Sequence, residues 1–180
     1  QPLWRHVAVH LDLEPLALDV EKTAYELSAF GTCIGIPADL STEAGCIGLA
    51  DELKSREGKL NILVNNAGVT WGAPLETYPA DAWDKIQNLN VKSAFLMTQK
   101  CLPLLSAAGT HEDPARVINI TSVAGQLTSS MQAYAYGPSK AALNHLTRIL
   151  ANELAAQHIT VNAIAPGVFP SKMTSFIMKN

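Results

Sequence analysis

Tyr136 and Lys140 lie four residues apart in the stretch AYAYGPSKAALNHLTRIL, whose apolar spacing indicates an amphipathic helix that begins near Tyr136. Residues i and i+4 share one helix face, so the two side chains are expected to meet. Lowering the pKa of a phenol from about 10 to near 7 takes about 4 kcal/mol. An ammonium about 4 Å away supplies roughly that amount at an effective dielectric constant near 20, and the positive end of the helix adds to it. The spacing therefore predicts a tyrosine that exchanges protons near neutrality.

The neighbouring residues decide which tyrosine this is. Pro138 falls in the predicted first turn, where the amide proton that proline lacks has no intrahelical partner. Tyr134 is the competing phenol, but Pro138 stands four residues after it and carries no charge. We predict that Tyr134 is a packing or pocket-wall residue. The alternative for Tyr136 is that it too is an aromatic residue packed on a loop.

Composition narrows the class of protein. The chain has 180 residues, of which 48% are apolar, and a formal net charge of -3, which indicates one soluble globular domain over residues 1–180. No basic run predicts a nucleic-acid partner, and no apolar run approaches the ~18 residues of a membrane span. The scattered Cys33, Cys46 and Cys101 indicate free thiols in a reducing compartment, so we expect a cytoplasmic protein. The five histidines show no ligand spacing, and no metal is predicted.

Strand and helix patterns alternate along nearly the whole chain. Strands are expected at 6–13, 32–40, 60–68, 115–122 and 159–167, and helices at 18–31, 43–57 (capped by Ser41), 80–105 (opened by Asp81) and from 136 onward. This alternation predicts an α/β fold with a parallel sheet. Small or polar residues end four of the strands, in PAD, NNAG, TS and PG. Ligands of open α/β sheets bind at those carboxyl ends, although each segment alone could be an ordinary turn.

Five segments carry a resemblance to a known family. They are NNAG at Asn65–Gly68, NLNVKSAF around Asn90, INITSVAG with Ser122, YGPSK at Tyr136–Lys140 and VNAIAPG at Val161–Gly167. In order and separation they resemble the short-chain dehydrogenase/reductase family, over about Ala38 to Gly167. The resemblance implies a doubly wound, Rossmann-like parallel sheet with helices on both faces, with 31–168 as the family core and 1–30 as an atypical N-terminal segment.

The resemblance also implies an activity. Members of this kind transfer a hydride between NAD(P)H and a carbonyl or alcohol, and Tyr136 would be the general acid/base. Lys140 would also hold the ribose of the nicotinamide half, Ser122 would hold the substrate oxygen, and Asn90 would open its helix locally and bind a water in a relay to the lysine. Other roles remain open: Ser122 could cap a turn, Asn90 could lie on a solvated helix face, and Thr121, Ser129 and Asn88 are weaker stand-ins.

The implied cofactor-binding residues are Asp39 at the adenine, Asn66, Ala67 and Gly68 along the adenosine, Tyr136 and Lys140 at the ribose, and Pro166, Gly167 and Val168 at the nicotinamide amide. Asp39 could instead be an ordinary residue approaching a helix. We expect NADP in preference to NAD. The expected partners are a small carbonyl or alcohol substrate and, in a complete protein, a second or further copies in a homodimer or homotetramer.

The sequence departs from the family before Asp39. The expected Gly-x-x-x-Gly-x-Gly turn, which would seat the pyrophosphate on a helix N-terminus, is missing, and Gly31 and Gly35 do not replace it. We therefore expect a fold that is incomplete at both ends, and the first strand of the related 3-2-1-4-5-6 order to be absent. Either 6–13 fills that position, or the sheet closes differently, or the chain is a piece of a larger protein. A catalytically silent remnant that binds cofactor or subunits is the alternative function, and dehydration or epimerisation is a weaker third.

Overall fold

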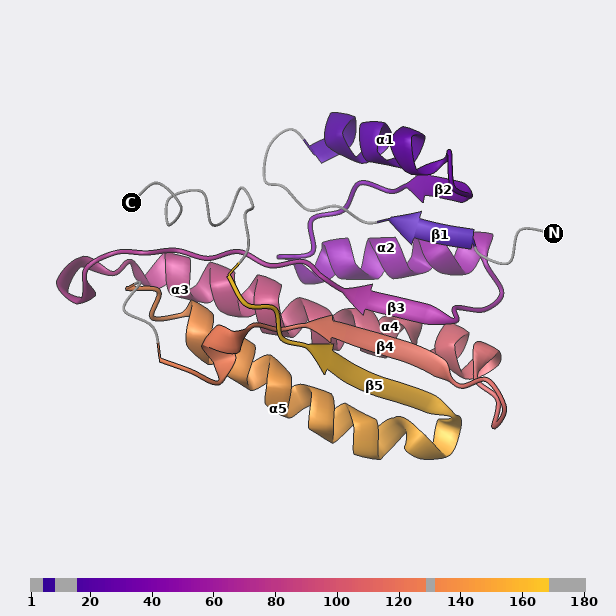
Figure 1. Ribbon diagram of the computed structural model, residues 1–180. Helices are drawn as coiled ribbons and strands as arrows, with labels where there is room; N and C mark the ends of the chain where they lie inside the picture. Colours follow the sequence, from indigo (N-terminus) through magenta and orange to yellow (C-terminus); the bar gives the residue numbers. More distant parts are fainter. Residues whose placement is uncertain (1–4, 9–15, 129–131, 169–180) are drawn as a thin grey trace.

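Parallel strands form two small sheets in the computed structural model, which describes residues 5–8, 16–128 and 132–168. Strand β1 (Arg5–Ala8) pairs with β2 (Thr32–Gly35). Strand β3 (Ile62–Asn65) pairs with β4 (Ala115–Ile120), which pairs with β5 (Ile159–Ile164). All pairings are parallel, and the strands alternate with helices (Figure 1). The predicted α/β fold with parallel strands and flanking helices is confirmed.

The register of the three-stranded sheet brings its carboxyl ends together. Asn65 at the end of β3 pairs with Asn119, and Ile120 at the end of β4 pairs with Ile164 at the end of β5. The chain therefore leaves all three strands at one edge of the sheet, on the left in Figure 1. The loops that follow these strands supply the candidate site, as expected for an open α/β sheet.

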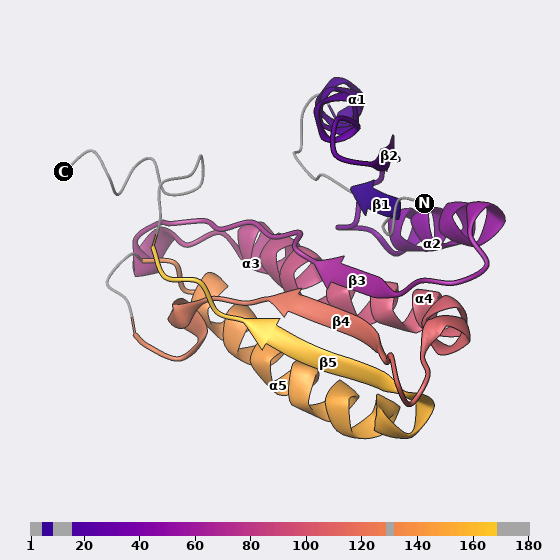
Figure 2. The same cartoon turned by 45° about the vertical axis from the view of Figure 1, so that its right-hand side comes forward.

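Helices cover one face of the three-stranded sheet. The helices are α1 (Leu16–Leu27), α2 (Glu43–Arg56), α3 (Ala80–Gln87), α4 (Ser93–Ala108) and α5 (Tyr136–Leu154). Helices α4 and α5 lie behind β3, β4 and β5, α2 packs on α4, and α1 packs on β2 (Figure 2). Among the described residues no helix covers the front face of this sheet (Figure 2). Val64 of β3 and Ile164 of β5 are half exposed.

The main core lies between the sheet and the helices behind it. Its buried members include Cys46 and Leu49 of α2, Leu105 of α4, Val117 of β4 and Ile159 of β5. These residues come from four separate elements of the chain, so the core fixes α2 and α4 against the strands. Burial of such side chains contributes about 1.5–3 kcal/mol each, which keeps the strand ends in place.

Strand β1 does not fill the position beside β3. In the part of the chain that the structure describes, β1 pairs with β2 alone and β3 pairs with β4 alone. The first alternative for the missing strand is therefore wrong for residues 5–8. The remainder of the predicted strand, residues 9–13, lies outside the described residues.

Several predicted boundaries need correction. The N-cap of α2 is Thr42, whose hydroxyl oxygen accepts the Gly45 N–H at 3.0 Å, because the cap is the residue directly before the first helical one. Ser41 instead donates to Asp39. Helix α1 ends at Leu27 rather than near Gly31. The predicted helix 80–105 is interrupted by a π-helical turn at Asn88–Lys92, and Pro79, not Asp81, is the residue before its first turn.

The described residues contain neither a membrane-spanning helix nor a cluster of metal-ligating side chains. None of the described helices is both long enough and apolar enough to cross a membrane. No group of three or more His, Cys, Asp or Glu side chains in the described ranges could hold a metal ion.

Candidate active site

Tyr136 and Lys140 occupy the first turn of α5, and their side chains lie together. The Lys140 ammonium stands over the Tyr136 ring, 5.6 Å from its centre. The same Nζ donates a hydrogen bond of 2.8 Å to the carbonyl of Ile120, the last residue of β4. Lys140 is 4% exposed, whereas Tyr136 is half buried. The helix start and the strand end thus hold a cation against a phenol ring that solvent still reaches.

The position of Lys140 changes its protonation. Burial disfavours its charged form and lowers the pKa of the ammonium from 10.5 to about 8. The amine therefore remains mostly protonated at pH 7 and loses its charge in the mildly alkaline range. The positive charge that the predicted chemistry needs is present at neutral pH.

Asn90 lies in the π-helical turn between α3 and α4, and its side chain is 1% exposed. Its Oδ1 accepts the N–H of Val69 at 2.9 Å, and its Nδ2 donates to the Val69 carbonyl at 3.0 Å and to the Ser139 hydroxyl at 3.0 Å. Asn90 is thus buried in the site rather than on a solvated helix face. Asn88, the weaker alternative, is exposed. A π turn is rare in proteins, and those that occur are frequently at functional sites.

Gly68, in the loop after β3, lies beside Asn90 and Lys140. A Cβ at this position would lie 3.3 Å from Asn90 Oδ1 and 3.3 Å from Lys140 Nζ. The loop after β3 therefore approaches both side chains closely because it carries no side chain there. Gly68, Asn90 and Lys140 form one compact cluster from three separate segments.

Ser122 follows β4 and begins the short 3-10 turn Val123–Gly125. Its Oγ accepts the N–H of Ala124 at 3.2 Å, so the hydroxyl caps a turn, which was the open alternative for this residue. Capping uses an oxygen lone pair and leaves the role of the hydroxyl proton to experiment. Thr121 is buried and donates to the Ile164 carbonyl at 3.1 Å. Ser129 lies outside the described residues.

The turn after Ser122 packs closely against α5. A Cβ at Gly125 would lie 2.7 Å from the carbonyl carbon of Lys140. The N–H of Val123 donates to the carbonyl of Pro166 at 3.1 Å, which fixes the loop after β5 beside the same turn. Gly167 and Val168 follow and are exposed. The segments of Ser122, Tyr136 and Pro166 are therefore neighbours.

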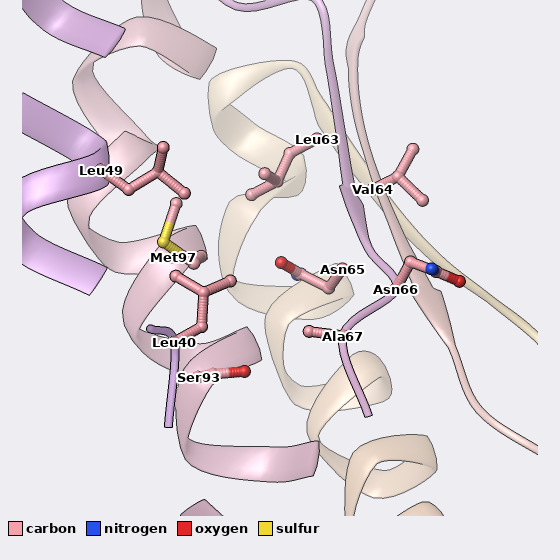
Figure 3. A pocket seen from close by; sticks show the side chains of 9 residues that line it. All are labelled: Leu40, Leu49, Leu63, Val64, Asn65, Asn66, Ala67, Ser93 and Met97. Atoms are coloured by element: carbon pink, nitrogen blue, oxygen red, sulfur yellow. The ribbon is translucent and has the colours of Figure 1, made fainter. Parts of the chain in front are cut away.

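The predicted adenosine-side residues Asn66, Ala67 and Gly68 directly follow the last residue of β3, Asn65. Asn65, Asn66 and Ala67 line a small cavity of about 50 Å³ together with Leu40, Leu49, Leu63, Val64, Ser93 and Met97 (Figure 3). Asn65 points toward Met97, whereas Asn66 points away to the other side of the strand. A cavity of this size holds at most a few water molecules and is far below the 300–1,000 Å³ typical of ligand sites.

Asp39 is engaged locally. Its Oδ1 accepts the backbone N–H of Ser41 at 2.9 Å and the Ser41 hydroxyl at 2.6 Å. These bonds form the approach to α2, which was the open alternative for Asp39. Tyr134 packs edge to face on Tyr78, with ring centres 5.5 Å apart, as the packing assignment predicted.

Comparison with known proteins identifies the family. The family model described as short chain dehydrogenase matches residues 6–180. The chain belongs to the short chain dehydrogenase family. The resemblance inferred from the five motifs is thereby confirmed.

Two relatives with curated names illustrate the range of the family. The chain is 58% identical over 155 residues to a rhamnolipids biosynthesis 3-oxoacyl-(acyl-carrier-protein) reductase of Pseudomonas aeruginosa, covering 86% of this chain and 60% of that protein. It is 33% identical over 158 residues to a 2-dehydro-3-deoxy-D-gluconate 5-dehydrogenase of Dickeya dadantii, covering 87% and 61%. The chain therefore spans about three-fifths of the length of these relatives.

Solved structures of short chain dehydrogenases share the fold. The Pseudomonas aeruginosa RhlG/NADP active-site complex superimposes with a TM-score of 0.90 at 53% identity, covering 97% of this chain and 66% of that one. A gluconate 5-dehydrogenase of Burkholderia cenocepacia in complex with NADP and tartrate gives a TM-score of 0.83 at 26% identity, covering 97% and 65%.

The residues present fit one half of a dinucleotide better than the other. The buried ammonium of Lys140 and the bare backbone at Gly68 make a polar site of close approach, suited to a ribose and its nicotinamide. In the described residues before Asp39, neither Gly31 nor Gly35 opens a helix after a strand. The pyrophosphate half thus has no matching turn in that region.

Sequence reasoning missed one residue of this cluster. Ser139 is fully buried, accepts from Asn90 and donates to the Tyr136 carbonyl at 2.7 Å. The available signal was a small hydroxyl three residues after Tyr136, where a helix places it back over the first turn.

Proposed function

We propose that the protein is an NADP-dependent reductase that converts a ketone to an alcohol, with Tyr136 as the general acid/base. The observation that carries the proposal is the placement of the Lys140 ammonium over the Tyr136 ring, beside Asn90 and Gly68 and at the carboxyl ends of β3 and β4. A perturbed cation beside a titratable partner at a strand-end cluster is a recognised mark of a catalytic site.

The residues divide the work as follows. A bound NADPH would supply the hydride that the carbonyl carbon accepts. Tyr136 gives its hydroxyl proton to the carbonyl oxygen, so that this oxygen becomes the hydroxyl of the alcohol and the phenolate remains on the protein. The ammonium of Lys140 stabilises that phenolate at neutral pH. Ser122 holds the substrate oxygen near the phenol, and proton return from solvent resets Tyr136.

The cofactor and the substrate class rest on relatives. The RhlG structure is described as an NADP complex, and the relative that is 58% identical carries the name of a 3-oxoacyl-(acyl-carrier-protein) reductase. We therefore prefer NADP over NAD and a 3-oxoacyl thioester as the substrate. Lys140 would hold the ribose, Asp39 and Asn66–Gly68 the adenosine, and Pro166–Val168 the carboxamide.

The direct test is NADPH oxidation with a panel of 3-oxoacyl thioesters and simple ketones, run on the chain and on its Tyr136→Phe variant. Removing the proton donor is expected to lower kcat by about 100- to 10,000-fold. Tyr134→Phe is the matched control, because it removes a phenol two residues away that packs on Tyr78. Equal turnover by wild type and Tyr136→Phe rejects the assignment.

A catalytically silent cofactor- or subunit-binding protein is the second candidate. It is favoured by β3, which has no second strand partner among the described residues, and by the missing pyrophosphate turn before Asp39. Calorimetric titration with NADPH and NADH separates the reductase from a silent protein that binds only subunits, and turnover in the NADPH assay separates it from one that binds cofactor without reaction. Micromolar binding of either dinucleotide removes the main reason to consider the chain silent.

We also propose that the protein associates with further copies of itself and that it is cytoplasmic. A shallow groove lies on α3, the π turn, α4 and α5, lined by Gln87, Asn88, Val91, Lys92, Phe95 and Leu146. Phe95 is 40% exposed and Ile149 of α5 is 53% exposed. Such apolar exposure supports a homodimer or homotetramer, which sedimentation of wild type and Phe95→Glu would test. The free thiols of Cys33, Cys46 and Cys101 support a reducing compartment.

A further inference from the structure

Ser139 connects two of the residues on which the proposed reaction depends. Asn90 and Ser139 are 49 positions apart in the sequence, yet Asn90 Nδ2 donates to Ser139 Oγ at 3.0 Å. Ser139 Oγ in turn donates to the carbonyl of Tyr136 at 2.7 Å. The hydroxyl thus uses its proton on the helix that carries Tyr136 and its lone pair on the π turn that carries Asn90.

The side chains of Ser139 and Asn90 are both buried away from solvent. Ser139 is 0% exposed and Asn90 is 1% exposed, so solvent does not replace a lost bond easily. The remaining hydrogen bonds of the Asn90 amide go to Val69, in the loop that follows β3 and Gly68. The bonds therefore run without a break from the Val69 backbone through Asn90 and Ser139 to the first turn of α5.

That first turn begins without a capping side chain. The residue before it, Ala135, has no side-chain cap, so a hydroxyl inside the turn carries part of the anchoring that a cap supplies elsewhere. Tyr136 and Lys140 both project from this turn. A shift of about 1 Å in such a group can lower a catalytic rate by about 100-fold.

We propose that Ser139 is a positioning residue whose buried hydroxyl fixes the Asn90 amide against the first turn of α5 and so sets where Tyr136 and Lys140 stand. The inference rests on the proposed function for its catalytic consequence. Its geometric part concerns the contacts among Val69, Asn90, Ser139 and Tyr136, and can be measured in a protein that turns over nothing.

The same helix offers a matched control. Thr147 of α5 is also buried, accepts from an asparagine amide (Asn119 Nδ2, 2.9 Å) and donates to a backbone carbonyl of its own helix (Leu143, 2.8 Å). Ser139→Ala and Thr147→Val each delete one hydroxyl and each leave one buried asparagine N–H without that acceptor. They differ in distance along α5 from Tyr136.

The experiment compares wild type, Ser139→Ala, Ser139→Thr and Thr147→Val in steady-state kinetics and in hydrogen exchange. Ser139→Ala is expected to lower kcat by about 10- to 100-fold with KM changed less than about threefold. Ser139→Thr keeps the hydroxyl and is expected to recover most of kcat. Thr147→Val is expected to keep kcat within about twofold of wild type. Equal kcat losses in Ser139→Ala and Thr147→Val overturn the proposal, because they report only general destabilisation.

Hydrogen exchange gives a readout that needs no turnover. The Val69 N–H, which donates to Asn90 Oδ1, is expected to exchange at least about tenfold faster in Ser139→Ala than in Thr147→Val, once global stability is matched. If wild type turns over no carbonyl with either dinucleotide, the proposed function fails, and Val69 exchange alone decides the inference. Unchanged Val69 exchange in Ser139→Ala then overturns it.

Discussion

The ammonium of Lys140 donates to the carbonyl of Ile120 across 2.8 Å, and this bond ties the start of α5 to the end of β4. A buried cation is anchored there by a neutral acceptor, and burial lowers its pKa to about 8. The arrangement joins stability to pH, because the native state holds the Lys140 proton less tightly than the unfolded chain does.

Stability is therefore expected to rise with pH through the range in which Lys140 titrates. Below pH 8 both states are protonated and the native state bears the full cost of the buried charge. Between about 8 and 10.5 the unfolded chain binds more protons, so the free energy of unfolding increases, by on the order of 3 kcal/mol in total. Urea unfolding of wild type and Lys140→Met at pH 7 and pH 10 measures this effect. The free energy of unfolding of wild type, relative to that of Lys140→Met, should be larger at pH 10 than at pH 7.

The control for this measurement is Lys54→Met, which removes an exposed lysine of α2 paired with Asp51. The difference in free energy of unfolding between Lys54→Met and wild type should stay nearly constant over the same pH range, apart from the small contribution of a surface ion pair. A Lys140→Met difference that is also constant would show that the Lys140 pKa is not depressed in the folded protein.

A second prediction concerns the glycine that holds the Ser122 turn against α5. A Cβ at Gly125 would stand 2.7 Å from the Lys140 carbonyl carbon and 2.8 Å from the Ala141 nitrogen. Because both are backbone atoms within a helix, neither can move aside cheaply. Gly125→Ala is expected to reduce the free energy of unfolding by about 1–3 kcal/mol, measured by chemical denaturation.

Gly48 provides the opposite case for comparison. It lies within α2, and a Cβ there meets nothing within 4 Å. Gly48→Ala is expected to stabilise the protein by up to about 1 kcal/mol, because alanine has the higher helix propensity. If Gly125→Ala proved as harmless as Gly48→Ala, the close contact between the Ser122 turn and α5 would be disproved.

Much of this architecture could be predicted from residues alone. The alternation of Val/Ile/Leu strands with helices predicted the parallel α/β fold, and the spacing of Tyr136 and Lys140 predicted two side chains on one helix face, which is where they lie. These features depend on local periodicity, which a single sequence contains.

Other features could not be predicted because they depend on tertiary contacts. The helix through Asn90 looked continuous, but the Asn90 amide bonds to Val69 and Ser139, and a π turn carries it there. Ser41 and Thr42 are both good caps by residue type, and only the observed start of α2 at Glu43 selects Thr42. Among the described residues β1 pairs with β2 and not with β3, and this choice of partner also depends on tertiary contacts.

The buried amide network behind the sheet gives a third prediction. Asn65 Nδ2 donates to Asn119 Oδ1 at 2.8 Å, and Asn119 Nδ2 donates to Thr147 at 2.9 Å, so β3, β4 and α5 are joined through polar side chains. Asn119→Leu would leave the Asn65 amide and the Thr147 hydroxyl with one partner fewer each. We expect a loss of about 2–4 kcal/mol in the free energy of unfolding, by chemical denaturation. Asn66→Leu, at an exposed neighbour of Asn65, should cost far less, and similar losses in both would contradict the network.

The last prediction concerns thiol reactivity. Cys101 is fully buried in α4, and burial raises the pKa of its thiol to about 11. Cys46 is fully buried in α2, and burial, with the nearby carboxylate of Asp39, raises the pKa of its thiol too. Cys33 on β2 is partly exposed.

Because the thiolate is the reactive form, iodoacetamide at pH 8 should alkylate Cys33 first and leave Cys101 unmodified until the protein unfolds. Peptide mass spectrometry over time, in native buffer and in urea, measures this order. Native labelling of Cys101 at the rate of Cys33 would mean that α4 opens readily, and the packing of α4 against β3 and β4 that positions Asn90 would then be wrong.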